Sequence, residues 1–313
     1  MKAIVVTDQA TGTAGMTLVE RPEPRAAIND VVVRIHASGF VPTEMEWPST
    51  WTDRAGRDRT PSIPGHELAG VVTALGYGTT GLSVGQRVFG LADWHRDGTL
   101  AEYVAIEARN LAPLPGDVDF DFAVGASLPI SGLTAWQGLF QHGRLQAGQT
   151  VLAHGAAGAV GAVGAVGAMV TQLAREAGAY VIGTGRAADR EKALDFGAHE
   201  FVDLENDALA DVGGVDLVFD VIGGDIQRRS ADLVKDGGTL VSVVGPVKTR
   251  PAAGLAVDFV VEADRAGLGE IVRRVRDGRL RTNIDDVSPL DDAVTALDPT
   301  ERRKGKTIIR VRP

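Results

Sequence analysis

The chain has 313 residues, 44% of them hydrophobic and 23% charged, which is enough to bury the core of one large domain or of two ordinary ones. It contains no cysteine, and this excludes disulfides, thiol nucleophiles and thiolate metal ligands. Its formal net charge of −9 opposes binding to a phosphate backbone, so we expect no nucleic-acid partner.

The N-terminal part of the chain is expected to be rich in β-strands. Its first residues lack the apolar core and cleavage site of a signal peptide, and no run in the chain approaches the roughly 18–20 apolar residues of a membrane span. Short β-rich runs follow at 30–40, 66–76, 85–94 and 100–106, separated by turns that carry glycine and proline. These runs predict an antiparallel, barrel-like domain. Without a signal peptide or a membrane span, we expect a cytoplasmic protein that has no membrane partner.

From residue 127 the pattern changes to an alternation of helices and strands. Segment 127–143 reads as a helix, and strands are expected at 150–155, 180–185, 200–204, 215–223 and 239–245. The helices expected between them end at Ala177 or span 188–197 and 225–238. This alternation predicts βαβ units and therefore a parallel sheet covered on both faces. Near residue 250 the regularity ends, and a helix at 289–298 and a strand at 305–313 form a tail that can return to the first domain.

A glycine stands at every third position from Gly155 to Gly167, directly after the strand at 150–155. At the carboxyl end of a strand in a parallel sheet, such a turn lets backbone amides face a pyrophosphate at a helix N-terminus. Close packing alone also explains small residues at a strand–helix junction, but the surrounding βαβ units favour nucleotide binding.

Seven motifs occur in order over nearly the whole chain: IPGHELAGVVTALG, VGQRVFGL, GTLAEYVAI, ASLPISGLTAWQGL, VLAHGAAGAVG, LDFGAHEFVD and RKGKTIIRV. Together they resemble the medium-chain dehydrogenase/reductase superfamily, and more narrowly its zinc-independent quinone oxidoreductase (zeta-crystallin-like) branch. The resemblance implies an α/β protein with a GroES-like β-rich catalytic domain at 1–126 and 251–313. It also implies a doubly wound Rossmann dinucleotide-binding domain at 127–250, and a homodimer.

Zinc-using members of this superfamily carry a cysteine where this chain has Val41, in the segment SGFVPTEM. Of their ligand pattern only His66 and Glu67 remain, whereas a catalytic zinc needs three protein ligands. The four-cysteine loop that holds a structural zinc in relatives is missing as well. We therefore expect no metal, and we interpret His66 as a hydrogen-bonded pocket or structural histidine rather than as a proton donor.

The end of the second predicted strand of the nucleotide domain indicates which cofactor is used. NAD-preferring folds place an acidic residue there, about 20 residues past the glycines, but this chain has Gly185. Arg186 follows at once, with Arg190 and Lys192 one turn further on. A guanidinium can hold a 2′-phosphate through paired hydrogen bonds. The alternative, a solvated basic helix start, is disfavoured by the helix dipole, so the sequence predicts NADPH rather than NAD.

The glycine run is about six residues longer than in the family that the chain resembles. Adding six residues to the helix would lengthen it by about 9 Å and turn it by about 600°, so we expect the surplus to loop out before the helix. The phosphate-facing amides are then those of Gly164, Ala165, Val166 and Gly167, since Gly164 lies 21 residues before Gly185. The window from Gly158 to Gly161 is the rival.

The resemblance also implies further site residues, each of which mere packing would explain equally well. Near the cofactor we expect Thr134, Thr184, Val221, Ile222, Val244 and Gly245. For the substrate-pocket wall we expect Val41, Pro42, Trp47, Trp51 and Trp94, with His66 beside them. Flat aromatic walls suit a flat, electron-poor substrate such as a quinone or an enone, although a tryptophan in a loop can also be a local anchor.

The expected activity is transfer of hydride from NADPH to a quinone or an α,β-unsaturated carbonyl, with no catalytic residue assigned. An enoyl thioester reductase of the same superfamily is one alternative. Such enzymes commonly use a tyrosine as the acid, and Tyr77, Tyr103 and Tyr180 all lie outside the segment VPTEMEW. A crystallin-like protein that binds NADPH without turnover is the other alternative.

Overall fold

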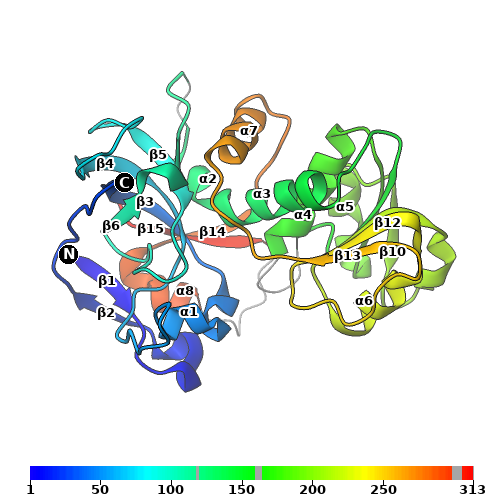
Figure 1. The fold of residues 1–313 in the computed structure, drawn as a ribbon, viewed down its shortest axis with the longest axis horizontal. Coiled ribbons are helices and arrows are strands. Elements are labelled where there is room, and N and C mark those ends of the chain that lie inside the picture. Colours follow the sequence, from blue (N-terminus) through cyan, green and yellow to red (C-terminus); the bar gives the residue numbers. More distant parts are fainter. Residues whose placement is uncertain (118–119, 159–163, 298–304, 313) are drawn as a thin grey trace. The chain divides into compact units, whose positions relative to one another are not determined.

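The computed structural model describes residues 1–117, 120–158, 164–297 and 305–312, which form two compact units (Figure 1). The first unit comprises Met1–Ile130, Glu262–Asp277 and Ile284–Pro313, and the second comprises Ser131–Val261 and Gly278–Asn283. None of the helices formed by the described residues has the length and apolar character of a membrane span.

A seven-stranded sheet of order β14-β15-β3-β4-β5-β7 forms the first unit, and β6 also pairs with β3. Its strands are β3 (Asp30–Gly39), β4 (Glu67–Leu75), β5 (Arg87–Leu91), β6 (Tyr103–Glu107), β7 (Leu111–Pro113), β14 (Ile284–Pro289) and β15 (Lys306–Arg310). All of these pairs are antiparallel except β14 with β15. The sheet therefore has the antiparallel character that the β-rich runs predict.

Apolar alternation along β3 supplies much of the core of this unit. Val31, Val33 and Ile35 stand two residues apart, so they point to one face of the strand. There they join Leu68 of β4 and Val88 of β5 in one buried cluster. The remaining elements are the antiparallel pair β1 (Lys2–Val5) and β2 (Thr17–Glu20) and the helices α1 (Pro48–Trp51), α2 (Phe122–Ser127), α7 (Arg265–Arg276) and α8 (Ala293–Ala296).

The second unit holds a six-stranded sheet in which every pair is parallel. Its order is β10-β9-β8-β11-β12-β13, from β8 (Thr150–Ala153), β9 (Tyr180–Gly185), β10 (Glu200–Asp203), β11 (Val215–Asp220), β12 (Val234–Ser242) and β13 (Leu255–Asp258). The helices α4 (Gly164–Glu176), α5 (Arg190–Asp195) and α6 (Gly224–Ala231) connect them. Figure 1 shows α4 and α5 on one side of this sheet and α6 on the other. The predicted doubly wound fold is thereby confirmed, and strand order reverses between β8 and β11.

Several predicted element boundaries are wrong. In place of the single helix predicted at 127–143, the chain forms α3 (Pro129–Trp136) and a π-helical turn at Gln137–His142. Ser127 is the last residue of the preceding helix α2, because Pro129 has no N–H to continue the ladder of α2. The helix predicted at 225–238 ends at Ala231, because the chain pairs with β11 from Val234 onward, where β12 begins. The sequence reading also missed α7, β13 and β14. Strand β13 pairs with β12 in the second unit, whereas the expected return to the first domain began at residue 251.

Candidate functional site

The carboxyl edge of the parallel sheet gathers most of the residues predicted to bind the cofactor. Carboxyl ends of parallel strands lie at one edge, and ligands bind where strand order reverses, here between β8 and β11. The last residues of four of these strands and the segments that follow them contain Gly158, Thr184, Gly185, Arg186, Val221, Ile222, Val244 and Gly245. Thr134 is buried in α3, and Gly161 lies outside the described residues.

The turn that follows β8 is tied to the strands on both sides of it. The His154 amide donates to the carbonyl of Phe219 at 3.1 Å, and the Ala156 amide donates to the carbonyl of Thr184 at 3.0 Å. Gly155 has a φ of +62° and Gly158 a φ of +70°, a region that glycine adopts without strain. Glycine is therefore needed here to reverse the chain over the sheet edge.

Helix α4 begins at Gly164 and its first turn packs closely on the turn after β8. A Cβ atom on Gly167 would lie 2.1 Å from the carbonyl oxygen of Gly155, so only glycine fits this position. The Thr171 hydroxyl of the next helical turn donates to the carbonyl of Ala156 at 3.2 Å. Since the first four amides of a helix have no partner within it, those of Gly164 to Gly167 are the amides that α4 can offer a ligand. Residues 159–163 lie outside the described part of the chain.

His154 is a fully buried histidine directly behind this turn. Ser230 donates its own hydroxyl proton to the Ile226 carbonyl at 2.7 Å, so it accepts from His154 Nε2–H at 2.8 Å. The Thr184 hydroxyl then donates to His154 Nδ1, also at 2.8 Å. Burial lowers the pKa of His154 to about 4, so the ring is neutral. The predicted cofactor residue Thr184 thus directs its side chain into the interior.

Asp220, at the end of β11, lies on the other side of the reversal of strand order, and the sequence reading missed it. One carboxylate oxygen accepts the amides of Ile222 at 3.0 Å and Gly223 at 2.8 Å. The other accepts Gln227 Nε2 of α6 at 2.9 Å and the Ser242 hydroxyl at the end of β12 at 3.0 Å. Asp220 therefore holds together two segments that contain predicted cofactor residues. A Cβ on Gly223 would lie 3.0 Å from a methyl of Val244, so these segments also touch.

The guanidinium groups of Arg186 and Arg190 are exposed to solvent at the end of β9. Arg186 Nε lies 3.5 Å from a carboxylate oxygen of Glu205, and Arg190 lies 3.7 Å from Asp207. All four side chains are about half exposed or more, so these ion pairs are weak and solvated. Both guanidinium groups are therefore available to an anionic ligand at the end of β9, where Gly185 stands in place of an acidic residue.

Lys192 is placed differently from the two arginines. Its half-buried ammonium donates to the Asn283 side-chain oxygen at 2.6 Å. The Asn283 amide nitrogen in turn donates to the carbonyls of Ala157 at 3.3 Å and Gly158 at 3.4 Å. Lys192 therefore supports the turn after β8 through Asn283, a contact that spacing along the sequence did not reveal.

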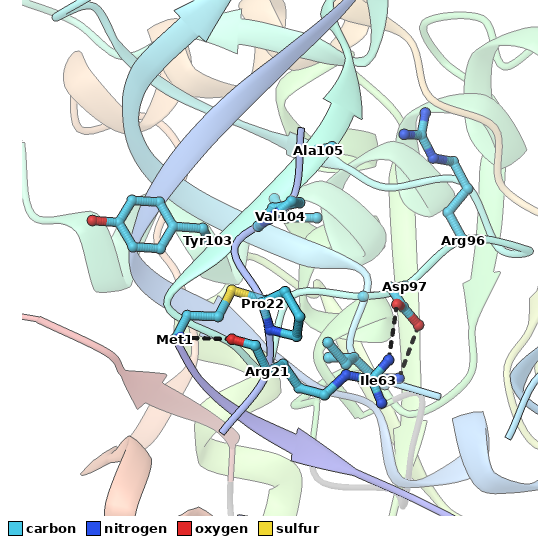
Figure 2. A pocket seen from close by; sticks show the side chains of 11 residues that line it. Met1, Arg21, Pro22, Ile63, Arg96, Asp97, Tyr103, Val104 and Ala105 are labelled. Carbon is cyan, nitrogen blue, oxygen red and sulfur yellow. Dashed lines mark hydrogen bonds and ion pairs between the residues drawn. The ribbon is translucent and has the colours of Figure 1, made fainter. Parts of the chain in front are cut away.

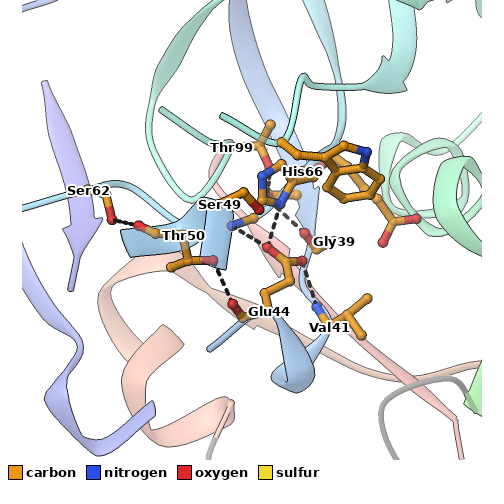
Figure 3. Close-up of polar contacts among 12 residues, drawn as sticks. Gly39, Val41, Glu44, Ser49, Thr50, Ser62, His66 and Thr99 are labelled. Carbon is orange, nitrogen blue, oxygen red and sulfur yellow. Dashed lines mark hydrogen bonds and ion pairs between the residues drawn. The ribbon is translucent and has the colours of Figure 1, made fainter. Parts of the chain in front are cut away.

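In the first unit, His66 is bound to a buried carboxylate that the sequence reading also missed. His66 Nδ1–H donates to Glu44 at 2.6 Å, and both side chains are almost completely inaccessible (Figure 3). Glu44 also accepts the amides of Val41 at 3.0 Å and Gly65 at 2.9 Å. Glu44 stands three residues after Val41, which is the spacing at which a carboxylate caps the start of a helix. This spacing is the sequence signal from which the role of Glu44 could have been predicted.

Of the three tryptophans expected in the substrate-pocket wall, two lie beside His66 and one lies in the core. The ring centroid of Trp94 lies 4.7 Å from that of His66, and Trp47 packs edge-on against Trp94 at 5.1 Å. Trp51 instead donates its indole N–H to the carbonyl of Met45 at 2.9 Å and belongs to a buried apolar cluster. Trp51 is thus a local anchor. Val41 is buried, and Pro42 is exposed.

Glu67, the neighbour of His66, is committed to a buried ion pair. Lys306 of β15 donates to one of its oxygens, and the Ile130 amide donates to the other at 2.8 Å. Burial raises the pKa of the Glu67 carboxyl, and the Lys306 ammonium opposes that shift. Among the described residues no three His, Cys, Asp or Glu side chains are grouped to hold a metal ion. These donors therefore do not fit a catalytic zinc.

A hollow of about 440 Å³ opens elsewhere on the first unit, beside β6 and the N-terminus (Figure 2). Its polar walls are already engaged, since the Met1 ammonium donates to the Arg21 carbonyl at 2.7 Å and Arg21 lies 3.9 Å from Asp97. None of the predicted site residues lines it.

Comparisons with known proteins agree with this arrangement. Two family models match, one described as alcohol dehydrogenase GroES-like domain over residues 27–116 and one as zinc-binding dehydrogenase over residues 196–309. The chain is 30% identical to the probable zinc-binding oxidoreductase, mitochondrial, of Arthroderma benhamiae, covering 95% of this chain and 93% of that protein. It is 27% identical to the NADPH-dependent alkenal/one oxidoreductase, chloroplastic, of Arabidopsis thaliana, covering 91% and 73%. The solved quinone oxidoreductase from Coxiella burnetii is 27% identical, with a TM-score of 0.86 over 100% of this chain and 99% of that one.

Proposed function

Because the chain belongs to the medium-chain dehydrogenase/reductase superfamily, in its quinone oxidoreductase-like branch, we propose that it is an NADPH-dependent, zinc-free reductase of quinones or α,β-unsaturated carbonyls. The observation that carries the proposal is the carboxyl edge of the parallel sheet. A close-packed glycine turn, the start of α4 and two exposed arginines meet there around a reversal of strand order.

The nucleotide supplies the hydride when it is bound, and residues of the second unit would hold it. We assign the pyrophosphate to the amides from Gly164 to Gly167, with the window from Gly158 to Gly161 as the rival. We assign the 2′-phosphate to Arg186, helped by Arg190. The remaining predicted contacts are Thr134 and Val244–Gly245 on the nicotinamide side and Val221–Gly223 on the adenosine side.

The assignment to quinones and enones rests on chemistry that both acceptors share. Each conjugated carbonyl delocalises the negative charge that hydride addition creates, so no metal is required to stabilise it. The relatives named for alkenal/one and quinone substrates support this class. We also propose that the protein works as a cytoplasmic homodimer.

The test is a panel of acceptors with NADPH and with NADH, followed by loss of reduced-nucleotide absorbance. We use 9,10-phenanthrenequinone, 1,4-benzoquinone, an alkyl enone and an enoyl thioester, and the chain has no thiol that would consume the quinones. We expect turnover of a quinone or the enone, and faster turnover with NADPH. Exclusive use of the thioester would favour an enoyl thioester reductase. NADPH binding without any turnover would overturn the proposal in favour of a binding protein.

A further inference from the structure

The turn after β10 places a carboxylate beside Arg186. Strands β9 and β10 are parallel neighbours, and Asp203 at the end of β10 pairs with Gly185 at the end of β9. Both strands therefore end at the same level, and the Leu204 amide donates to the Gly185 carbonyl at 2.9 Å. The residues that follow, Arg186 and Glu205, lie side by side, with a Glu205 carboxylate oxygen 3.5 Å from Arg186 Nε.

Asp203, rather than the side chain of Glu205, fixes the shape of this turn. One Asp203 carboxylate oxygen accepts the Glu205 amide at 3.1 Å, and the other accepts the Asn206 side-chain amide at 2.6 Å. The Asp203 amide donates to the Asp207 carboxylate at 2.9 Å, which commits Asp207 to the turn as well. The side chain of Glu205 is instead 67% exposed, so it can change partners without disturbing the turn.

The guanidinium group of Arg186 has two anions to choose between. The Glu205 carboxylate lies beside it in the structure, and the proposed function assigns the 2′-phosphate of NADPH to it. Carboxylates and phosphates both bind to the same fork of guanidinium N–H donors. Exposed ion pairs contribute little free energy, because water screens them and two long side chains have to be ordered. A bound phosphate can therefore displace Glu205, but the free energy of that ion pair is then lost.

We propose that Glu205 competes with the 2′-phosphate of NADPH for Arg186, and that it thereby sets how strongly the protein prefers NADPH to NADH. The inference rests on the proposed function. A nucleotide without a 2′-phosphate leaves the pair between Arg186 and Glu205 intact. NADPH has to break this pair, and it brings a phosphate close to the released carboxylate, which repels it. Glu205 therefore weakens the binding of NADPH alone and reduces the preference that Arg186 creates.

The first experiment uses nucleotide fragments that lack the nicotinamide and cannot react. Adenosine 2′,5′-bisphosphate carries the 2′-phosphate and 5′-AMP does not, and isothermal titration calorimetry measures both dissociation constants. We expect Glu205→Gln to bind the bisphosphate about three- to fivefold more tightly than the wild type, which is the effect of releasing one exposed ion pair. Its affinity for 5′-AMP should equal that of the wild type. Equal affinity of Glu205→Gln and the wild type for the bisphosphate would overturn the inference.

Asp236→Asn is the matched control for the change in net charge. Asp236 is an exposed acidic residue near the start of β12, away from the carboxyl edge of the sheet. The substitution removes one negative charge from the second unit, as Glu205→Gln does, and should leave both fragment affinities unchanged. A gain in bisphosphate affinity as large as that of Glu205→Gln would show that net charge is responsible, and it would contradict competition at Arg186.

A double-mutant cycle with the same fragments tests whether Glu205 acts through Arg186. In the Arg186→Ala background there is no pair to break, so we expect Glu205→Gln to improve bisphosphate binding by less than about twofold. Equal improvement in both backgrounds would overturn the inference. If Arg186→Ala weakens bisphosphate binding and Glu205→Gln does not change it, this inference fails alone. If Arg186→Ala binds the bisphosphate as tightly as the wild type, the 2′-phosphate assignment of the proposed function fails, and this inference fails with it.

Discussion

At the scale of residues, we propose that the charge of Arg186 distinguishes the two nicotinamide cofactors. NADPH carries a 2′-phosphate that NADH lacks, and the Arg186 guanidinium is 55% exposed with only a weak pair to Glu205. We expect Arg186→Ala to weaken NADPH binding about ten- to a hundredfold, the cost of one charge-assisted phosphate contact. NADH binding should be unchanged. Nucleotide fluorescence titration measures both constants.

Lys235→Ala is the matched control for this prediction. Lys235 is a comparably exposed cation that pairs with Asp216 of β11. It lies at the start of β12 and therefore away from the carboxyl edge. It should leave both nucleotide affinities intact. Equal losses of NADPH and NADH binding in Arg186→Ala would show a structural role only.

His154 makes the stability of the second unit depend on pH. Its folded-state pKa of about 4 lies below the ordinary value of 6.5, so the unfolded chain binds an additional proton between these pH values. The free energy of unfolding should therefore fall as pH drops from 6.5 towards 4, by up to about 3 kcal/mol from this residue. Above pH 6.5 its contribution is fully present.

Urea unfolding across this pH range checks the prediction. His154→Gln should be less stable at pH 7, because Thr184 and Ser230 lose their partner, but its stability should fall less steeply with acid. His95→Gln should keep the wild-type slope. An unchanged slope in His154→Gln would place the acid sensitivity elsewhere.

At the scale of elements, the packing of α4 on the turn after β8 depends on the missing side chain of Gly167. A methyl group there would lie 2.1 Å from the Gly155 carbonyl oxygen and 2.7 Å from that of His154, so either the helix or the turn has to move. We expect Gly167→Ala to destabilise the protein by about 1–3 kcal/mol and to weaken NADPH binding. Chemical denaturation and nucleotide titration measure the two effects.

Gly269→Ala is the control for that substitution. Gly269 lies inside α7 with open space around its Cα, so alanine should stabilise the helix by up to about 1 kcal/mol. A Gly167→Ala protein as stable as this control, with normal NADPH affinity, would mean that the contact is not needed.

The elements that sequence predicted well are those whose signal is local. Alternating strands and helices predicted the parallel sheet, and the glycine run predicted the turn at its edge. Element ends failed where a distant contact decided them: Val234 extends β12 because it pairs with Val215. Helix α7 was missed although Leu268, Ile271 and Val272 recur at helical spacing. That pattern was readable from the sequence.

At the scale of the whole molecule, the side chains that could ligate a metal predict that no zinc is bound. The chain has no cysteine, His66 is bonded to Glu44, and Glu67 is paired with Lys306. Elemental analysis of the purified protein should find no stoichiometric zinc, and EDTA should leave its reductase activity intact. Activity that is lost on chelation and restored by zinc would contradict the proposal, whereas magnesium added in parallel should have no effect.

The site was predictable only as far as its parts are close in sequence. Arg186 follows Gly185 directly, so its place at the strand end could be inferred. Glu44 and His66 are 22 residues apart, and Asp220 bonds to Ser242 across two strands, so only the tertiary fold brings these partners together. The sequence reading accordingly named His66 without the carboxylate that orients it.

The ion pair between Glu67 and Lys306 joins residues that are 239 positions apart, and this separation has a consequence for biosynthesis. A ribosome releases β3 and β4 early, but β15, which pairs with β3 and carries Lys306, emerges only after all strands of the parallel sheet. Until then Glu67 lacks the Lys306 ammonium, and the part of the β3 edge at residues 37–39, which β15 later covers, is open to other chains. We therefore expect the first unit to complete its sheet and its buried ion pair only at the end of translation.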